Sequence, residues 1–181
     1  KILYNAINTS VYTYSFEKAV TIREKLHVEQ NLVIGHVGRF DAQKNHTFLL
    51  DIFSECVNIV PNARLLLVGD GEGRTQIQEK AKSLGLEEKV IFTGVRNDVA
   101  DLLQAMDVFV FPSLYEGVPV TMIEAQASGL PCVISDGVPK DCVITSGLVT
   151  SMKLSDRPCD WAKHIAAQLN SCLLYTSDAA D

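Results

Sequence analysis

The order in which apolar runs alternate with helical patterns constrains the fold of this chain more than any other feature. Five short runs rich in β-branched and aromatic residues are each followed by a segment with helical spacing of its apolar residues. The runs span 32–38, 63–71, 89–94, 107–113 and 131–135, and the helical segments span 45–60, 72–86, 97–106, 119–128 and 159–169. This order predicts an α/β fold: a Rossmann-like parallel sheet with helices on both faces and right-handed crossovers.

The predicted topology also indicates where a ligand would bind. In an open parallel sheet, ligands lie outside the carboxyl ends of the strands. The motifs described below each follow directly after one of the expected strands. We therefore expect their side chains to converge on one edge of the sheet.

Composition removes several classes of protein. The 181 residues are 47% hydrophobic and 21% charged, which suits a globular domain with a core. No run of about 18 apolar residues is present, so no membrane span is expected. The net charge of −6 argues against a general nucleic-acid binder, and it means that local positive groups must hold any anionic ligand.

The cysteines and histidines do not indicate a metal site. The five cysteines form no CxxC pair, and their odd number suits reduced thiols in a cytoplasmic protein. The four histidines are scattered along the chain, with no spacing typical of metal ligands. We expect neither a metal nor a cofactor.

A cationic turn follows the first expected strand, in the segment GRFDAQKN. Gly38 ends the strand, and a helix is expected to begin near Asn45, so Arg39 and Lys44 lie close to a helix N-terminus. Such a terminus already favours an anion. Arg offers a planar fork to phosphate oxygens and Lys offers a point charge. The alternative for this segment alone is a solvated loop with two ordinary surface charges.

The segment VGDGEGR after the second expected strand resembles a dinucleotide-binding turn only in part. The full pattern needs a glycine where this chain has Arg74. A tight turn between a strand and a helix fits the segment at least as well. We therefore reject NAD binding as the leading interpretation.

The segment YEGVPV places an acid directly before a helix. Glu116 lies in the loop, and Gly117 permits a turn with positive φ and a close backbone approach to a ligand. The N–H groups of Gly117, Val118 and Val120 would face a bound polar group, whereas Pro119 has none to offer. The alternative is that Glu116 only complements the helix dipole.

A second acid, Glu124, follows Glu116 after eight positions, on a polar stripe of the helix that could be simply solvated. Eight helical residues rise about 12 Å, whereas the carboxyl pair of a retaining glycosidase lies about 5–5.5 Å apart. Carboxylates are good acceptors for vicinal hydroxyls. A cationic turn and two spaced acids together favour a ligand with a diphosphate and many hydroxyls, which describes a nucleotide sugar.

Four segments, in this order and spacing, carry a resemblance to a known family: GRF…KN, LLLVGDGEGR, VIFTGVRNDV and DVFVFPSLYEGVPVTMIEAQASGLPCVIS. They resemble the donor-binding C-terminal domain of family 4 (group 1) retaining glycosyltransferases of the GT-B fold, closest to bacterial capsular and exopolysaccharide enzymes. The resemblance covers roughly residues 1–170. It implies a linker and leading segment over 1–30 and a donor-binding domain over 31–170. In the opening YNAIN, Ala6 stands where the family often has Gly.

The resemblance implies roles for the residues singled out above. Arg39 and Lys44 would bind the donor diphosphate and stabilise the leaving group without a metal, and Glu116 would lie against the donor sugar. Glu124 would accept hydrogen bonds from the ribose. The residues expected to contact the donor are Gly38, Val95, Arg96, Gly117, Val118, Pro119, Val120 and Glu124, with Val95 and Arg96 near the base.

The resemblance also bounds what the chain could do. The acceptor-binding N-terminal domain of the family is not in this sequence, and the chain reads as the start of a fragment that would be inactive alone. The final residues, 171–181, do not continue the preceding helical pattern, and we expect them to be a non-native tail. Membrane contact is expected only through the full-length enzyme. A non-catalytic nucleotide-sugar-binding module and a sugar epimerase of the same architecture remain alternatives.

Overall fold

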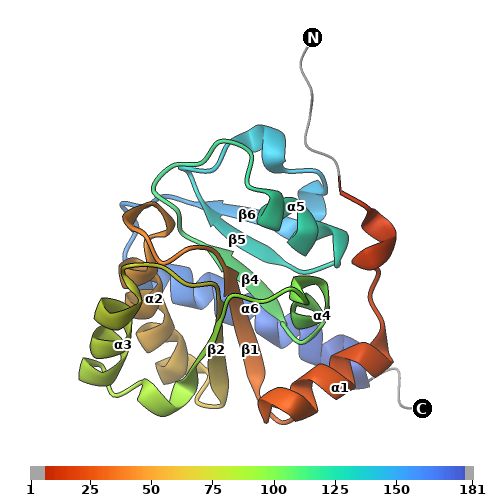
Figure 1. Ribbon diagram of the computed structural model, residues 1–181, viewed down its shortest axis with the longest axis horizontal. Helices are drawn as coiled ribbons and strands as arrows, with labels where there is room; N and C mark the ends of the chain where they lie inside the picture. Colours follow the sequence, from red (N-terminus) through yellow and green to blue (C-terminus); the bar gives the residue numbers. More distant parts are fainter. Residues whose placement is uncertain (1–6, 178–181) are drawn as a thin grey trace.

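A six-stranded parallel sheet lies between two layers of helices in the computed structural model, which describes the backbone of residues 7–177 and the side chains through residue 169 (Figure 1). The strands are β1 (Leu32–Val37), β2 (Ala63–Val68), β3 (Val90–Gly94), β4 (Val108–Phe111), β5 (Cys132–Ser135) and β6 (Val149–Met152). Their order across the sheet is β3-β2-β1-β4-β5-β6, and neighbouring strands pair in parallel. The predicted Rossmann-like α/β fold is confirmed.

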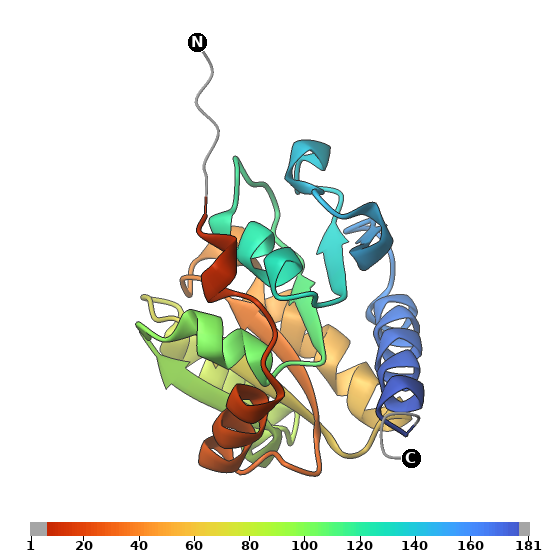
Figure 2. The same ribbon diagram turned by 90° about the vertical axis from the view of Figure 1, so that its right-hand side faces the viewer.

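Helices cover both faces of the sheet, as expected. The α-helices are α1 (Phe16–Leu26), α2 (His46–Ile59), α3 (Arg74–Ser83), α4 (Val99–Gln104), α5 (Val120–Ala127) and α6 (Pro158–Ser177). Short 3-10 turns are η1 (Thr9–Val11), η2 (Ala42–Lys44), η3 (Glu87–Lys89), η4 (Lys140–Cys142) and η5 (Ser146–Leu148). One apolar cluster joins the sheet to α2, α3 and α6, and another joins it to α1, α4 and α5 (Figure 2).

The two clusters explain why the central strands are apolar throughout. In β1, Ile34 belongs to the cluster under α2, whereas the neighbouring Val33 belongs to the cluster under α4. Successive side chains of a strand point to opposite faces, and both faces are covered here. The continuous apolar pattern therefore marks a strand that is buried on both faces.

Helix α1 and strand β6 were not anticipated from the sequence. Helix α1 begins after Ser15, whose hydroxyl accepts a hydrogen bond from the Lys18 N–H, and it buries Ala19 and Ile22. Strand β6 lies at the edge of the sheet beside β5 and has one buried residue, Met152. A four-residue edge strand carries little of the alternation or apolar content by which strands are recognised.

The last helix is longer than the helical pattern indicated. We expected that pattern to end near residue 169, but α6 continues to Ser177. The backbone therefore stays helical through most of the expected tail 171–181, and residues 178–181 lie outside the described part. Helix α6 packs beside α2 through Trp161, whose ring meets Phe48 edge to face.

The order of the strands places a topological switch point at the centre of the carboxyl edge. From β1 the chain proceeds to β2 on one side of the sheet, and it later returns to place β4 on the other side. The connections from β1 to β2 and from β4 to β5 therefore run to opposite sides of this switch point, where ligands bind in open α/β sheets. These are the loops that carry Arg39, Lys44 and Glu116.

Candidate functional site

The loop after β1 is a compact turn fixed to its neighbours on both sides. Asp41 accepts a hydrogen bond from the Lys44 N–H at 3.2 Å and so caps η2. Asn45 adopts the left-handed conformation with φ 56°, and its side-chain amide donates to the Pro112 carbonyl at 3.2 Å. The loop after β1 is thereby tied to the loop after β4.

The glycine-rich turn after β2 supports this cationic loop from the other side. Gly69 has φ 137°, and a Cβ atom there would overlap the carbonyl oxygen of Gly38. A Cβ atom at Gly71 would lie 2.8 Å from the Phe40 nitrogen, and the Phe40 N–H donates to the Asp70 carbonyl at 3.0 Å. These glycines therefore let two backbone segments pack directly against each other.

Lys44 and Glu116 form an ion pair across the switch point. The Lys44 Nζ atom lies 2.6 Å from Glu116 Oε1, and it lies 4.7 Å from the centroid of the Phe111 ring. The two side chains are only 15% and 5% exposed. Gly38 leaves room for the pair, because a Cβ atom there would lie 3.2 Å from the aliphatic stem of Lys44.

Gln43 holds the same carboxylate and was not predicted from the sequence. Its Nε2 atom donates to Glu116 Oε2 at 3.2 Å and to the Tyr115 carbonyl at 2.9 Å. Both oxygens of Glu116 therefore have a donor in this structure. Gln43 carries no charge, so the cationic motif Arg39…Lys44 by itself did not mark it.

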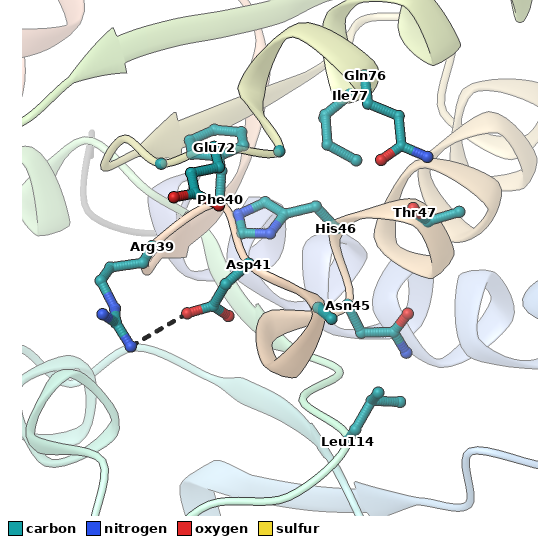
Figure 3. A pocket seen from close by; sticks show the side chains of 13 residues that line it. Arg39, Phe40, Asp41, Asn45, His46, Thr47, Glu72, Gln76, Ile77 and Leu114 are labelled. Atoms are coloured by element: carbon teal, nitrogen blue, oxygen red, sulfur yellow. Dashed lines mark ion pairs between the residues drawn. The ribbon is translucent and has the colours of Figure 1, made fainter.

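Arg39 differs from Lys44 although both lie on one loop. Its side chain is 80% exposed, and its ion-pair partner among the described residues is Asp41, at 3.2 Å. Figure 3 shows this pair beside a cavity of about 810 Å³ that is lined also by Phe40, His46 and Glu72. Little desolvation opposes a new anionic partner of the guanidinium.

The segment before α5 differs in one respect from the prediction. Gly117 is not among the glycines with positive φ, so the chain does not adopt the left-handed turn that a glycine permits there. The turn is set instead by the Glu116 N–H, which donates to the Gly137 carbonyl at 3.1 Å, and by Pro119 at the N-cap. A Cβ atom at Gly117 would meet nothing within 4 Å, so the space beside it is open.

The first turn of α5 is open to a ligand. Within the described part of the chain, no side chain caps its first N–H groups. Val118 and Val120 are 49% and 37% exposed, whereas Pro119 is buried. The polar backbone and two apolar side chains thus lie together at the surface beside Glu116.

Glu124 lies inside α5 and has a partner that sequence reasoning missed. The Tyr12 hydroxyl donates to Glu124 Oε1 at 2.7 Å, from a segment 112 positions earlier in the chain. Burial, and after it the hydrogen bond to Glu124 and the negative charge of Glu124, together raise the pKa of Tyr12 to about 12. The carboxylate is half-buried, so part of it stays accessible.

The loop after β3 lies on the same edge, on the far side of β2 from the switch point. Val95 is 77% exposed. Arg96 donates to both oxygens of Asp98, at 2.8 and 2.5 Å, and this hydrogen bonding holds the pKa of Asp98 below its usual value. Because its guanidinium is engaged, the loop offers mainly backbone groups and the Val95 side chain to a ligand.

The structure thus brings some of the predicted residues into contact and leaves others apart. Lys44 touches Glu116, with Arg39 on the same loop, while Glu124 contacts Tyr12. Val95 and Arg96 share the edge, but no contact joins them to these groups in the described residues. No group of three potential metal ligands is found within the described part of the chain.

Fold and site define a Rossmann-like α/β domain of the kind that forms one half of a GT-B glycosyltransferase. The chain belongs to the family described as glycosyl transferases group 1, whose model matches residues 31–171. Among curated relatives, it is 44% identical over 135 residues to a putative glycosyltransferase EpsF of Bacillus subtilis, covering 75% of this chain and 35% of that protein. It is 30% identical over 147 residues to an Escherichia coli UDP-Gal:alpha-D-GlcNAc-diphosphoundecaprenol alpha-1,3-galactosyltransferase, covering 79% and 38%.

Solved structures agree with this assignment of the fold. Anabaena HepE in complex with UDP and glucose superposes with a TM-score of 0.83 at 25% identity, over 98% of this chain and 48% of that one. The lipopolysaccharide glycosyltransferase WaaG superposes with a TM-score of 0.83 at 21% identity, over 94% and 47%. The chain spans about half of these structures and little more than a third of the curated relatives just described.

Proposed function

We propose that this chain is the donor-binding half of a glycosyltransferase that moves a sugar from a nucleotide-diphosphate sugar to an acceptor with retention, in cell-surface polysaccharide synthesis. The observation that carries the proposal is the position of two cations and a buried carboxylate around the β1/β4 switch point. Related proteins support it, because HepE forms a complex with UDP and glucose, and another relative is a Vi polysaccharide biosynthesis protein.

The Lys44–Glu116 pair suggests how a donor is received. A diphosphate in the crevice would compete with Glu116 for the Lys44 ammonium, and the exposed Arg39 would close on it from the same loop. Glu116, no longer bound by the Lys44 ammonium, would then accept a hydrogen bond from the sugar. As the glycosidic bond breaks, both cations would stabilise the negative charge that develops on the leaving diphosphate.

The other residues of the edge would bind the remaining parts of the donor. The uncapped first turn of α5, with the N–H groups of Gly117, Val118 and Val120, would contact phosphate or sugar. Glu124 would accept hydrogen bonds from the ribose. Because Arg96 is held by Asp98, the loop after β3 would contact the base through its backbone.

Nucleotide binding with a charge-matched pair of variants tests the proposal. Arg39 and Arg157 are both exposed, at 80% and 73%, and each pairs with a nearby aspartate. Among UDP, GDP and ADP, we take the nucleotide that binds most tightly. We expect Arg39→Ala to lower the affinity for it about tenfold or more, which is the value of one charge-assisted hydrogen bond. Arg157→Ala, which removes the same charge elsewhere, should leave the affinity unchanged in calorimetry. Equal affinities for both variants would contradict the proposal.

Several wider features belong to the same proposal. The acceptor site would lie on a further domain, so the chain alone would bind donor but not transfer sugar.

None of the helices in the described part is long and apolar enough to cross a membrane. The four cysteines whose side chains are described are free thiols, which supports a cytoplasmic setting. Transfer without a metal predicts that the full-length enzyme keeps its rate after treatment with EDTA.

An epimerase or a non-catalytic module of this architecture would share the donor site, so nucleotide binding alone does not separate them from a transferase. Product analysis of the full-length protein with donor in the presence and absence of acceptor does. Transfer only with acceptor supports the proposed function. Epimerised donor formed without acceptor would support the epimerase.

A further inference from the structure

We propose that Tyr12 is a positioning residue of the donor site, whose hydroxyl fixes the Glu124 carboxylate in the orientation that receives the ribose hydroxyls. The inference rests on the proposed function, since it takes Glu124 as the ribose-binding carboxylate. It adds a residue from the leading segment, outside the strands and helices that surround the crevice. Figure 2 shows this segment passing beside α5 and α4.

The contact leaves the carboxylate able to bind a ligand. The Tyr12 hydroxyl donates to Oε1 of Glu124 at 2.7 Å, and Glu124 is half-buried. An ionised carboxylate has about four acceptor positions on its two oxygens. One hydrogen bond from Tyr12 therefore occupies a single position, stops free rotation of the carboxylate, and leaves Oε2 for a ribose hydroxyl.

Tyr12 is itself held in place by a buried amide. Gln104 of α4 is 4% exposed, its Nε2 atom donates to the Tyr12 carbonyl at 3.3 Å, and its Oε1 atom accepts from the Ser15 N–H at 3.0 Å. The Tyr12 N–H donates to the Thr9 carbonyl at 3.0 Å, and its ring packs against the cluster under α4 and α5. A chain of contacts from α4 therefore determines where the hydroxyl points.

The hydroxyl remains a donor over the whole working range of pH. Burial, and then Glu124, raise the pKa of Tyr12 to about 12, so the proton stays on the phenol near neutrality. A phenylalanine at this position would keep the ring and its packing but would lose this donor. Each binding event would then cost the conformational entropy of orienting the Glu124 side chain.

The competing explanation is that Tyr12 only fastens the leading segment to α5. Both explanations predict some loss of stability in Tyr12→Phe, so stability does not separate them. They differ in what the ligand must contain. A positioning role acts through ribose hydroxyls, whereas a fastening role would affect a nucleotide with or without them.

The test compares Tyr12→Phe with Tyr14→Phe in the 181-residue chain. Tyr14 is two positions away, is 58% exposed, and serves as the matched control. The probes are the nucleoside diphosphate that binds best among UDP, GDP and ADP, and its 2′,3′-dideoxy counterpart. Calorimetry gives the affinities, and thermal unfolding confirms that each variant is folded at the working temperature.

We expect Tyr12→Phe to lower the affinity for the ribonucleotide about two- to tenfold, which is the effect of immobilising one side chain. The affinity for the dideoxy nucleotide should change less than about twofold. Tyr14→Phe should change neither. Equal loss for both nucleotides, or no loss, overturns the inference. Arg39→Ala in the same series separates the two proposals: weakened binding there with no ribose-specific effect of Tyr12→Phe rejects only the inference. Failure of all three diphosphates to bind the parent chain rejects both.

Discussion

At the scale of single residues, the two cations of the loop after β1 have opposite environments. Lys44 is 15% exposed and pairs with a carboxylate that is 5% exposed, whereas Arg39 is 80% exposed. Removing one partner of a buried pair leaves the other charge without compensation, but an exposed pair is worth little. Lys44 therefore has a structural role besides the one proposed for it, and Arg39 is available for a ligand at small structural cost.

This contrast predicts different effects on stability. Lys44→Ala should lower the free energy of unfolding by about 3 kcal/mol, because Glu116 is left buried and charged. Arg39→Ala should change it by less than about 0.5 kcal/mol. Urea denaturation of both variants measures the difference. Similar values for the two would mean that the Lys44–Glu116 pair is not closed in solution.

A second residue-scale prediction concerns pH and His46. This side chain is 3% exposed, and burial, aided by the charge of Lys44, lowers its pKa to about 4. The unfolded chain binds this proton near pH 6.5. Stability is therefore complete above pH 6.5 and is lost as the pH falls toward 4, by roughly 2 kcal/mol between pH 7 and pH 4.5.

Replacing the histidine tests this assignment. His46→Leu should reduce the loss of unfolding free energy between pH 7 and pH 4.5. Buried His36 keeps the part of its lowered pKa that burial causes and loses the part that the neighbouring His46 causes. His164→Gln on the exposed face of α6 is the control and should leave the profile unchanged. An unaltered profile in His46→Leu would show that His46 does not titrate as described.

At the scale of elements, the strands and helices that position the site are those with the clearest sequence patterns. Strands β1 and β2 are buried on both faces and read as continuous apolar runs, and α2 shows helical spacing up to Pro61. Helix α1 buries only Ala19 and Ile22, so its pattern is weak. Elements with little buried surface are poorly marked in a sequence, because burial is what selects apolar residues.

Turns are predictable only where the residue type requires them. Gly69 requires its glycine because it combines φ 137° with backbone contact to Gly38, whereas Gly117 has neither a positive φ nor a close neighbour. Both are glycines at strand-to-helix turns, and the sequence does not distinguish them. The difference arises from a second loop that packs against only one of them.

The two glycines therefore differ in their tolerance of a side chain. Gly69→Ala should destabilise the domain by more than about 2 kcal/mol, since the new methyl group meets backbone in a strained conformation. Gly117→Ala should stay within about 0.5 kcal/mol of the parent chain. Chemical denaturation decides between them. A destabilised Gly117→Ala variant would contradict the open space described beside that residue.

At the scale of the whole molecule, the strand order accounts for what the sequence could and could not predict about the site. A parallel α/β order places the loops after β1 and β4 on one edge, so Arg39, Lys44 and Glu116 were predictable as neighbours. The partners Gln43 and Tyr12 were not, because their contacts depend on side-chain directions and on a leading segment that the pattern left unassigned. Contacts between distant segments leave no periodic mark in a sequence.

The central claim is that the crevice between the carboxyl ends of β1 and β4 holds the diphosphate of a nucleotide. Amide chemical shifts of the labelled 181-residue chain, followed by NMR during titration with UDP, GDP and ADP, test it most directly. The account predicts that the largest changes fall in 38–45 and 116–124, with smaller changes at Val95 and Arg96. Changes gathered instead at the opposite edge of the sheet, in the hollow around Arg23 and Asp107, would contradict it.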